Sequence, residues 1–191
     1  MNLPTFHMDR KTTINLSKFL SLVLRHKPDT IGITLDPSGW IDVDTLLAAM
    51  TAHGKKLSRE DLQEIVVTSD KQRFALSEDG RRIRANQGHS VEVELGYAPA
   101  IPPEVLYHGT AVKYLDSIRT GGVVKGKRHD VHLSATIDTA TAVGQRHGTL
   151  VMLRIDAAAM HRAGHEFFLT PNGVWLTDTV PVGFFEVVNA P

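Results

Sequence analysis

The chain has 191 residues, of which 42% are hydrophobic and 22% charged, a balance that excludes a disordered chain and allows one domain or two small ones. The 21 basic and 21 acidic residues cancel and there is no cysteine, which excludes disulfides and thiolate metal sites and argues against a broad basic surface for nucleic acid. Without a long apolar run, and without a secretory signal in Met1–Pro4, we expect a cytoplasmic protein that has no membrane partner.

The first part of the chain is predicted to be rich in helices. An apolar stripe over residues 16–24 has helical spacing, and this helix should end near His26 because Pro28 disfavours helical geometry at the residue before it. Further elements predicted in this part are a turn at 36–39, a helix over 42–50, a helix over about 59–68 that begins with a Ser58–Asp61 capping box, and a hairpin formed by 73–76 and 81–85. Three helices and a hairpin are the outline of a winged-helix domain.

A proline-rich connector over residues 97–103 separates the two parts of the chain. Three prolines in five residues make this segment stiff and extended, and neither a helix nor a central strand can cross it. We therefore predict two domains, over residues 1–97 and 103–191.

The second part is predicted to be a smaller α+β domain in which short strands and helices alternate. Strands are predicted over 105–108, 131–134, 150–155, 166–169, 173–176 and 184–188, and helices over about 111–119, 137–146 and 157–162. This part is large enough for one hydrophobic core.

Two candidate sites for anions lie in the first part. Arg25 and His26 fall in the last turn of the first helix, whose dipole favours cations and would keep His26 protonated; this suits an anion site with a proton donor. Cations also commonly decorate a helix C-terminus without any function. Arg73 should lie on the face opposite Phe74, in what is either a phosphate site or a solvated basic hairpin, and polar groups converge around a glycine in Gln87–Ser90.

Two further clusters lie in the second part. A strand that ends in His108–Thr110 and leads into a helix offers donors suited to a phosphate or a ribose, although a structural turn explains the tripeptide equally well. Strand alternation predicts that Arg128, Asp130, His132 and Ser134 share one face. We expect no metal, because neither cysteine nor a zinc-binding histidine spacing is present.

Together these segments resemble the RNA 2′-phosphotransferase family of the KptA type. The resemblance extends over almost the whole chain, and its order across both parts makes it specific. The segments that carry it are Ser17–Pro28, Ile83–Ser90, Leu106–Thr110, Arg128–Ser134 and Asn172–Thr177. The resemblance implies an α+β protein with an N-terminal winged-helix lobe that binds RNA, followed by a C-terminal ADP-ribosyltransferase-like α/β lobe that binds NAD.

The reaction implied by this resemblance removes an internal RNA 2′-phosphate and consumes NAD as co-substrate. The 2′-phosphate attacks C1″ of the nicotinamide ribose and expels nicotinamide, after which the ribose O2″ attacks phosphorus. The products are RNA with a free 2′-OH and ADP-ribose 1″,2″-cyclic phosphate. The family name makes tRNA the expected RNA partner and tRNA processing the expected context, and no protein partner is implied.

The resemblance assigns the catalytic roles to Arg25, His26, Arg73 and Arg128. Arginine forks hold a phosphate in fixed geometry as a lysine point charge does not, and His26 would transfer a proton to the leaving RNA oxygen. The residues that it assigns to NAD are His108, Gly109, Thr110, His132, Ser134 and Val174, the last standing where other ADP-ribosyltransferases carry a catalytic glutamate.

Two groups of residues leave the resemblance incomplete. Asp130 stands where the family commonly has histidine, and an anion there could weaken phosphate binding. Residues before about Asn15 match no part of the pattern, and we expect such a terminus to be mobile. For Arg84, Gln87, His89 and Ser90 we expect contact with the 2′-phosphate or the nearby RNA backbone.

Two other functions compete with this interpretation. An ADP-ribosyltransferase proper would stop after the first step and leave ADP-ribose on a nucleic-acid phosphate or a protein, which does not require all four catalytic residues. A winged-helix nucleic-acid binder with a ligand-sensing lobe would be no enzyme at all, and the zero net charge and the lack of a basic recognition helix argue against it.

Overall fold

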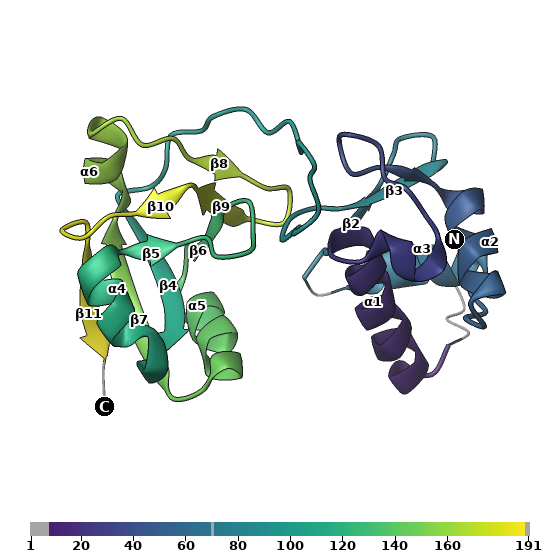
Figure 1. Cartoon of the computed structure of the whole chain (residues 1–191), viewed down its shortest axis with the longest axis horizontal. Helices are drawn as coiled ribbons and strands as arrows, with labels where there is room; N and C mark the ends of the chain where they lie inside the picture. Colours follow the sequence, from purple (N-terminus) through teal and green to yellow (C-terminus); the bar gives the residue numbers. More distant parts are fainter. Residues whose placement is uncertain (1–7, 70, 190–191) are drawn as a thin grey trace, which may run out of the picture. The chain divides into compact units, whose positions relative to one another are not determined.

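The computed structural model describes residues 8–69 and 71–189 and divides the chain into two compact units, Met1–Gly96 (unit 1) and Tyr97–Pro191 (unit 2) (Figure 1). Met1–Pro4, from which we expected no secretory signal, lies outside the described residues. Across the ranges that are described, no helix is both long and apolar enough to cross a membrane.

Helix α1 (Arg10–Arg25) opens unit 1 and ends where the sequence predicts. The Asp9 carboxylate accepts hydrogen bonds from the backbone N–H groups of Lys11 and Thr12, which fixes the start of the helix. Residues 10–14 are therefore helical, and the expectation of a mobile terminus up to Asn15 is wrong for them. The other helices of unit 1 are the 3₁₀ helix η1 (Pro28–Ile31), α2 (Val43–Ala52) and α3 (Arg59–Thr68), and α3 carries the predicted capping box.

The predicted hairpin of unit 1 is present as β2 (Phe74–Leu76) and β3 (Arg82–Ala85), which pair antiparallel. A two-residue strand that the sequence did not predict, β1 (Ile41–Asp42), adds to the other edge of β3. The resulting three-stranded sheet packs with the helices around one core, whose fully buried members include Leu20, Leu24, Leu46, Met50, Leu62 and Ile83.

The proline-rich connector is packed on unit 2. The backbone N–H of Ala100 donates to the carbonyl of Phe167 at 2.7 Å, and Pro99 forms a β-bridge with Phe168. Proline is tolerated at such a place because an edge position needs no donor from it.

Unit 2 is built on a six-stranded antiparallel sheet with the order β11-β7-β4-β6-β9-β8 (Figure 1). Its strands are β4 (Val105–Ala111), β6 (Val131–Ser134), β7 (Leu150–Asp156), β8 (Phe168–Leu169), β9 (Val174–Thr177) and β11 (Phe185–Asn189). A separate pair, β5 (Val123–Val124) and β10 (Thr179–Val180), was not predicted. The helical elements are η2 (Val112–Tyr114), α4 (Leu115–Gly121), α5 (Ile137–Gly144), η3 (Gln145–His147) and α6 (Ala157–Arg162). The protein is thus a mixed chain of helices and antiparallel sheets.

Gly109 allows β4 and α5 to approach closely. A Cβ atom at Gly109 would overlap the carbonyl of Ala140, and one at Gly144 would collide with the backbone of Gly109. Close packing of β4 against α5 within unit 2 therefore requires glycine at position 109.

Gly109→Ala is expected to lower the free energy of unfolding by about 3 kcal/mol, the upper part of the usual range for overpacking, because backbone rather than a flexible side chain meets the new methyl group. Urea-induced unfolding followed by tryptophan fluorescence measures this. Gly121→Ala is the matched control: the site in α4 has open space and an ordinary backbone conformation, so its stability should be unchanged or slightly raised. Equal unfolding midpoints for the two variants would contradict a tight approach of β4 and α5.

Candidate functional site

The C-terminal end of α1 is held against two distant segments of unit 1. Arg25 Nη2 donates to the carbonyl of Arg73 at 3.2 Å, and the carbonyl of Arg25 accepts from the backbone N–H of Ser90 at 2.8 Å. Residues separated by 48 and 65 positions in the chain thus meet at one point, which we call the α1 cluster: Arg25, His26, Arg73 and Ser90.

His26 is exposed in this cluster, and Ser90 orients it. The ring Nδ1 of His26 lies 2.9 Å from Ser90 Oγ, so the imidazole is directed by a residue from the segment after β3. A cationic fork, a second arginine and an oriented imidazole that reaches solvent form a combination that suits an anion which must also exchange a proton. The structure brings together Arg25, His26, Arg73 and Ser90 among the predicted site residues of this unit.

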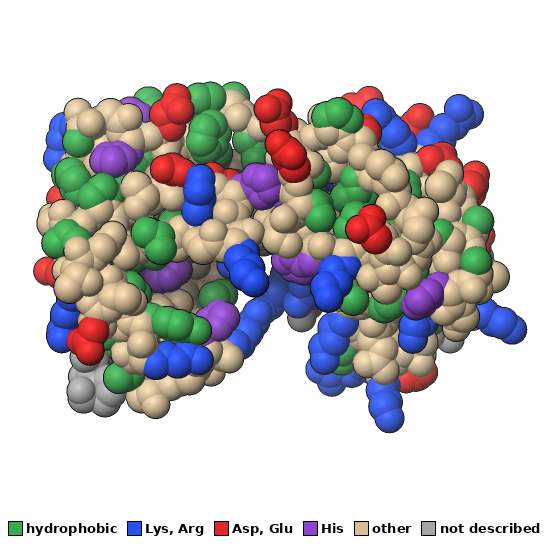
Figure 2. Space-filling view, in the orientation of Figure 1, with side chains coloured by type: hydrophobic (Ala, Val, Ile, Leu, Met, Phe, Trp, Pro, Cys, Tyr) green, Lys and Arg blue, Asp and Glu red, His purple; other side chains and the backbone are tan. Residues whose placement is uncertain are grey.

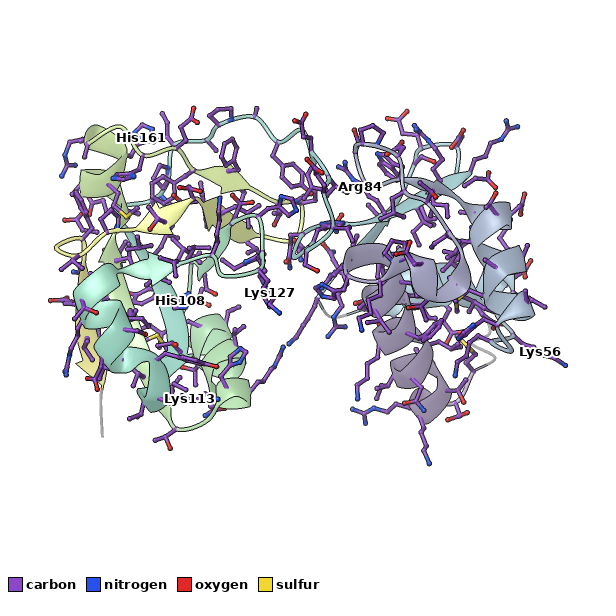
Figure 3. All side chains as sticks on the ribbon, in the orientation of Figure 1. Lys56, Arg84, His108, Lys113, Lys127 and His161 are labelled. Atoms are coloured by element: carbon purple, nitrogen blue, oxygen red, sulfur yellow. The ribbon has the colours of Figure 1, made fainter. Side chains whose placement is uncertain are left out.

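Arg84 and His89 make structural contacts with the turn that precedes β1. Arg84 donates to the carbonyls of Ser38 and Leu95 at 3.4 and 3.2 Å, and its guanidinium lies 4.6 Å above the ring centre of Trp40. Figure 3 shows Arg84 beside β3 in unit 1. His89 is only 2% exposed and lies against Gly39 of the same turn. These contacts explain both residues without RNA, and contact of Arg84, Gln87 and His89 with a 2′-phosphate stays a prediction.

Asn86 is a residue that the sequence analysis missed. Its buried side chain donates to the carbonyl of Gln72 at 2.6 Å, and its backbone N–H donates to the carbonyl of Arg73 at 2.9 Å. Gln72 has a φ of 39°, a left-handed conformation that is unfavourable for a residue with a side chain. Asn86 therefore holds the bend that sets the position of Arg73, and no sequence signal other than its place beside Gln87–Ser90 pointed to it.

In unit 2 the predicted cofactor residues come together on three adjacent strands. Ser134 of β6 lies opposite Tyr107 of β4 on one side and Val174 of β9 on the other. His132 and Ser134 are half-buried and alternate with buried Val131 and Leu133, so they share one face of the sheet as predicted.

His108 bridges β4 and β6, which pair through a single residue pair. Its Nδ1 lies 3.0 Å from the carbonyl of His132. Burial lowers the pKa of His108, the hydrogen bond with this carbonyl raises it, and the positive charges of Arg128 and His147 lower it further. A neutral ring whose Nδ1 faces a carbonyl carries its proton there, which leaves Nε2 as a hydrogen-bond acceptor. Figure 3 shows His108 on β4 within unit 2.

Gly109 and Thr110, unlike His108, are explained by packing within unit 2. Thr110 is buried, and Gly109 is in close contact with α5, so both residues have structural roles in unit 2. Their predicted contact with a cofactor is not needed to explain them.

Arg128 and Asp130 lie in the loop before β6, because this strand begins only at Val131. The expectation that strand alternation places them on the face of His132 and Ser134 is therefore wrong. The backbone N–H of Arg128 donates to the carbonyl of Lys125 at 3.2 Å, and Lys125 forms an ion pair with Asp178 at 2.5 Å. Burial raises the pKa of Asp130, as does the negative charge of Asp178, while Lys125 and His129 lower it. Lys125 thus offsets part of the negative charge that Asp130 brings to this loop.

The part of the chain that the structure describes contains no group of three or more His, Asp or Glu side chains that could hold a metal ion. The α1 cluster instead offers arginine, imidazole and hydroxyl groups, and the face shared by His132 and Ser134 offers imidazole and hydroxyl groups. Such groups suit anions and sugar hydroxyls, which is the chemistry expected of the class of proteins that act on phosphorylated compounds.

Comparison with known proteins gives this class a family. The sequence profile of the family described as RNA 2′-phosphotransferase, Tpt1 / KptA matches residues 11–179. A "Probable RNA 2′-phosphotransferase" of Pseudomonas aeruginosa is 58% identical over 180 residues, which cover 94% of this chain and 99% of that protein. Proteins with the same description are 53% identical in Burkholderia lata (100% of this chain, 99% of that one) and 51% identical in Streptomyces coelicolor (91% and 94%).

The chain belongs to the RNA 2′-phosphotransferase family, which is a family of transferases. The resemblance noted from the sequence is thereby confirmed. The match begins at residue 11, so the expectation that residues before about Asn15 match no part of the pattern is wrong for residues 11–14.

Proposed function

We propose that the protein removes an internal 2′-phosphate from RNA in two steps that consume NAD. Unit 1 would be a winged-helix lobe that binds RNA, since its described residues form three α-helices and a three-stranded antiparallel sheet. Unit 2 would be an ADP-ribosyltransferase-like lobe that binds NAD. The observation that carries the proposal is the α1 cluster, in which Arg25, His26 and Arg73 are brought together by hydrogen bonds in a member of this family.

In the first step a 2′-phosphate oxygen forms a bond to C1″ of the nicotinamide ribose while the bond from C1″ to nicotinamide breaks. The nucleophile is already an anion, so it needs positioning rather than a base. Arg25, Arg73 and Arg128 supply the cations that position it. Val174, opposite Ser134, places an apolar side chain where a carboxylate would repel the phosphate.

In the second step the ribose O2″ loses its hydroxyl proton to solvent and forms a bond to phosphorus, and the bond from phosphorus to the RNA O2′ breaks. Negative charge spreads over the phosphoryl oxygens, where fixed arginine forks stabilise it most strongly. The leaving O2′ takes a proton, and His26 is the group that donates it, oriented by Ser90.

For NAD, the residues of unit 2 fit the groups that must be held. The Nε2 acceptor of His108 and the hydroxyl of Ser134 are suited to bind ribose hydroxyls. His132 and Ser134 share one half-buried face of the sheet, so a ligand can contact both residues from the same side. We propose His108, His132, Ser134 and Val174 as the inner part of this site, and Gly109 and Thr110 as its support.

Asn86→Ala is expected to lower kcat by about tenfold to 100-fold, because a small displacement of a positioning group is costly in catalysis. Loss of the hydrogen bond to Gln72 should cost about 1 kcal/mol of stability. Asn15→Ala, an exposed change on α1, is the control for both measurements. Steady-state kinetics together with urea unfolding separates the two effects. A loss of stability with unchanged kcat would show that Asn86 supports the fold but does not position Arg73.

The proposed function is tested by mixing the protein with NAD and a short RNA that bears one internal 2′-phosphate, and by identifying the products by mass. We expect RNA with a free 2′-OH, nicotinamide and ADP-ribose cyclic phosphate, and no reaction without NAD or without the 2′-phosphate. RNA that gains ADP-ribose and stops would support the ADP-ribosyltransferase alternative. Phosphate removal without NAD, or no reaction at all, would contradict the proposal.

A further inference from the structure

A cavity of about 440 Å³ lies in unit 1 between α1, α3 and the segment that leads into β2. One end of it is formed by Arg25 and Arg73 of the α1 cluster, and from there it follows α1 towards Ile14. We call this cavity the α1–α3 groove. Its size falls within the usual range for a ligand site of modest size.

The groove is lined with cations and hydroxyl groups. Lys18, Arg25, Lys71 and Arg73 contribute positive charge, and none of the described residues that line it is acidic. Several serine and threonine side chains also face it, and the hydroxyl of Ser69 is buried there without a hydrogen-bond partner among the described residues. The net charge of the chain is zero, so this group of cations creates a positive potential within the groove that favours binding of an anion there. On the face shown in Figure 2, Lys and Arg side chains gather on the α1 side of unit 1.

The shape of the groove indicates an extended anion rather than a single phosphate. Ile14, Lys18, Ser21 and Arg25 follow one another at helical spacing on one side of α1, so the groove extends about 16 Å along the helix at 1.5 Å per residue. Arg25 and Arg73 stand at one end of the groove, and Lys18 and Lys71 add positive charge to its lining beyond these two arginines. Ile14 and Ile65 add apolar surface that suits sugar or base faces.

We propose that the α1–α3 groove binds the backbone of a single RNA strand beside the nucleotide that carries the 2′-phosphate. Lys18 and Lys71 contact the flanking phosphodiesters, and Ser69 donates to one of them. This inference rests on the proposed function, because it takes the Arg25–Arg73 end as the place of the 2′-phosphate. A duplex is too wide for a cavity of this volume, so the strand bound there is unpaired, which is the form in which proteins most often reach the bases of RNA.

The test compares two RNAs: a dinucleotide with the 2′-phosphate at its junction, and an unpaired octanucleotide with the same 2′-phosphate in the middle. Binding without NAD is measured by fluorescence anisotropy for the wild-type protein, for Lys18→Ala/Lys71→Ala and for Lys56→Ala. Lys56 is the matched control because it is exposed on the side of α2 away from α1 (Figure 3).

We expect the wild-type protein to bind the octanucleotide more tightly than the dinucleotide. Loss of two phosphate contacts should reduce the salt slope for the octanucleotide by about 1.4, so between about 50 and 200 mM salt the wild-type affinity falls about sevenfold more than that of the double variant. Affinity for the dinucleotide should be the same in all three proteins, and Lys56→Ala should match the wild type throughout.

An unchanged salt slope and octanucleotide affinity in the double variant would overturn the groove proposal, as would an equal loss for both RNAs. Equally tight binding of the octanucleotide when it is annealed to its complement would also overturn it. If the wild-type protein binds the dinucleotide no better with its 2′-phosphate than without it, the proposed function fails rather than the groove. The two failures are therefore distinct.

Discussion

Arg73→Lys and Arg128→Lys are each expected to lower kcat/KM for a 2′-phosphorylated RNA by about 10³-fold, although both changes keep the positive charge. A guanidinium presents two parallel N–H groups to two phosphate oxygens, and this geometry is what stabilises the charge that develops in the second step. A lysine ammonium supplies charge without the fork. A loss of this size would identify geometry, rather than net charge, as the contribution of these arginines.

The structure explains why the fold should survive these two changes. The carbonyl of Arg73 accepts hydrogen bonds from Arg25 and from the backbone of Asn86, so the main chain at residue 73 is fixed whichever side chain it carries. Arg128 lies in a turn that its own backbone N–H closes onto Lys125. Circular dichroism and urea unfolding of both variants should therefore resemble those of the wild type.

The controls for this prediction are lysine substitutions at arginines that belong neither to the α1 cluster nor to the proposed site residues of unit 2. Arg81→Lys in unit 1 and Arg119→Lys in unit 2 change exposed side chains and should leave kcat/KM unchanged. Near-wild-type turnover by Arg73→Lys and Arg128→Lys would rule out the arginine clamp. A loss in the controls as well would show that the assay responds to surface arginine in general.

Local sequence signals predicted most of the elements because these elements have local causes. Pro28 ends α1, the Ser58–Asp61 box begins α3, and alternation marks β6. The strands β1, β5 and β10 have two residues each and, unlike the equally short β8 within the predicted strand 166–169, carry no apolar pattern of their own; they form because a partner strand lies beside them. Their cause is tertiary, so no local pattern could predict them.

The residues of the candidate site also divide into those with a local sequence signal and those whose role depends on tertiary contacts. Arg25 and Arg73 were found through residue type and family resemblance, but the contact between them joins positions 48 apart and could not be read from either segment. Asn86 was missed because its role depends on the left-handed backbone at Gln72. Glutamine rarely adopts this conformation, so the sequence does not predict it there. Strand alternation was extended too far at Arg128, because β6 begins only at Val131, three residues later than this extension assumed.

His26→Ala is expected to separate the two steps of the reaction, so that ADP-ribosylated RNA accumulates. The first step needs no proton on the departing nicotinamide nitrogen and none from His26, whereas the second must protonate the leaving O2′ of the RNA. Loss of a positioned general acid typically costs about 10²–10⁴ in rate, and we expect that loss in the second step alone. Single-turnover time courses, with the RNA species separated by mass, measure both steps at once.

Ser90→Ala is a second variant that should produce a smaller effect of the same kind. Ser90 orients the imidazole through a contact of 2.9 Å with Nδ1 but leaves the ring in place, so the second step should slow by less than in His26→Ala, while the first step stays at the wild-type rate. Intermediate should then accumulate to a smaller extent and clear more quickly. If both steps slow equally in His26→Ala and no ADP-ribosylated RNA appears, His26 acts in binding rather than as the proton donor. A Ser90→Ala protein with an unchanged second step would mean that α1 alone orients the ring.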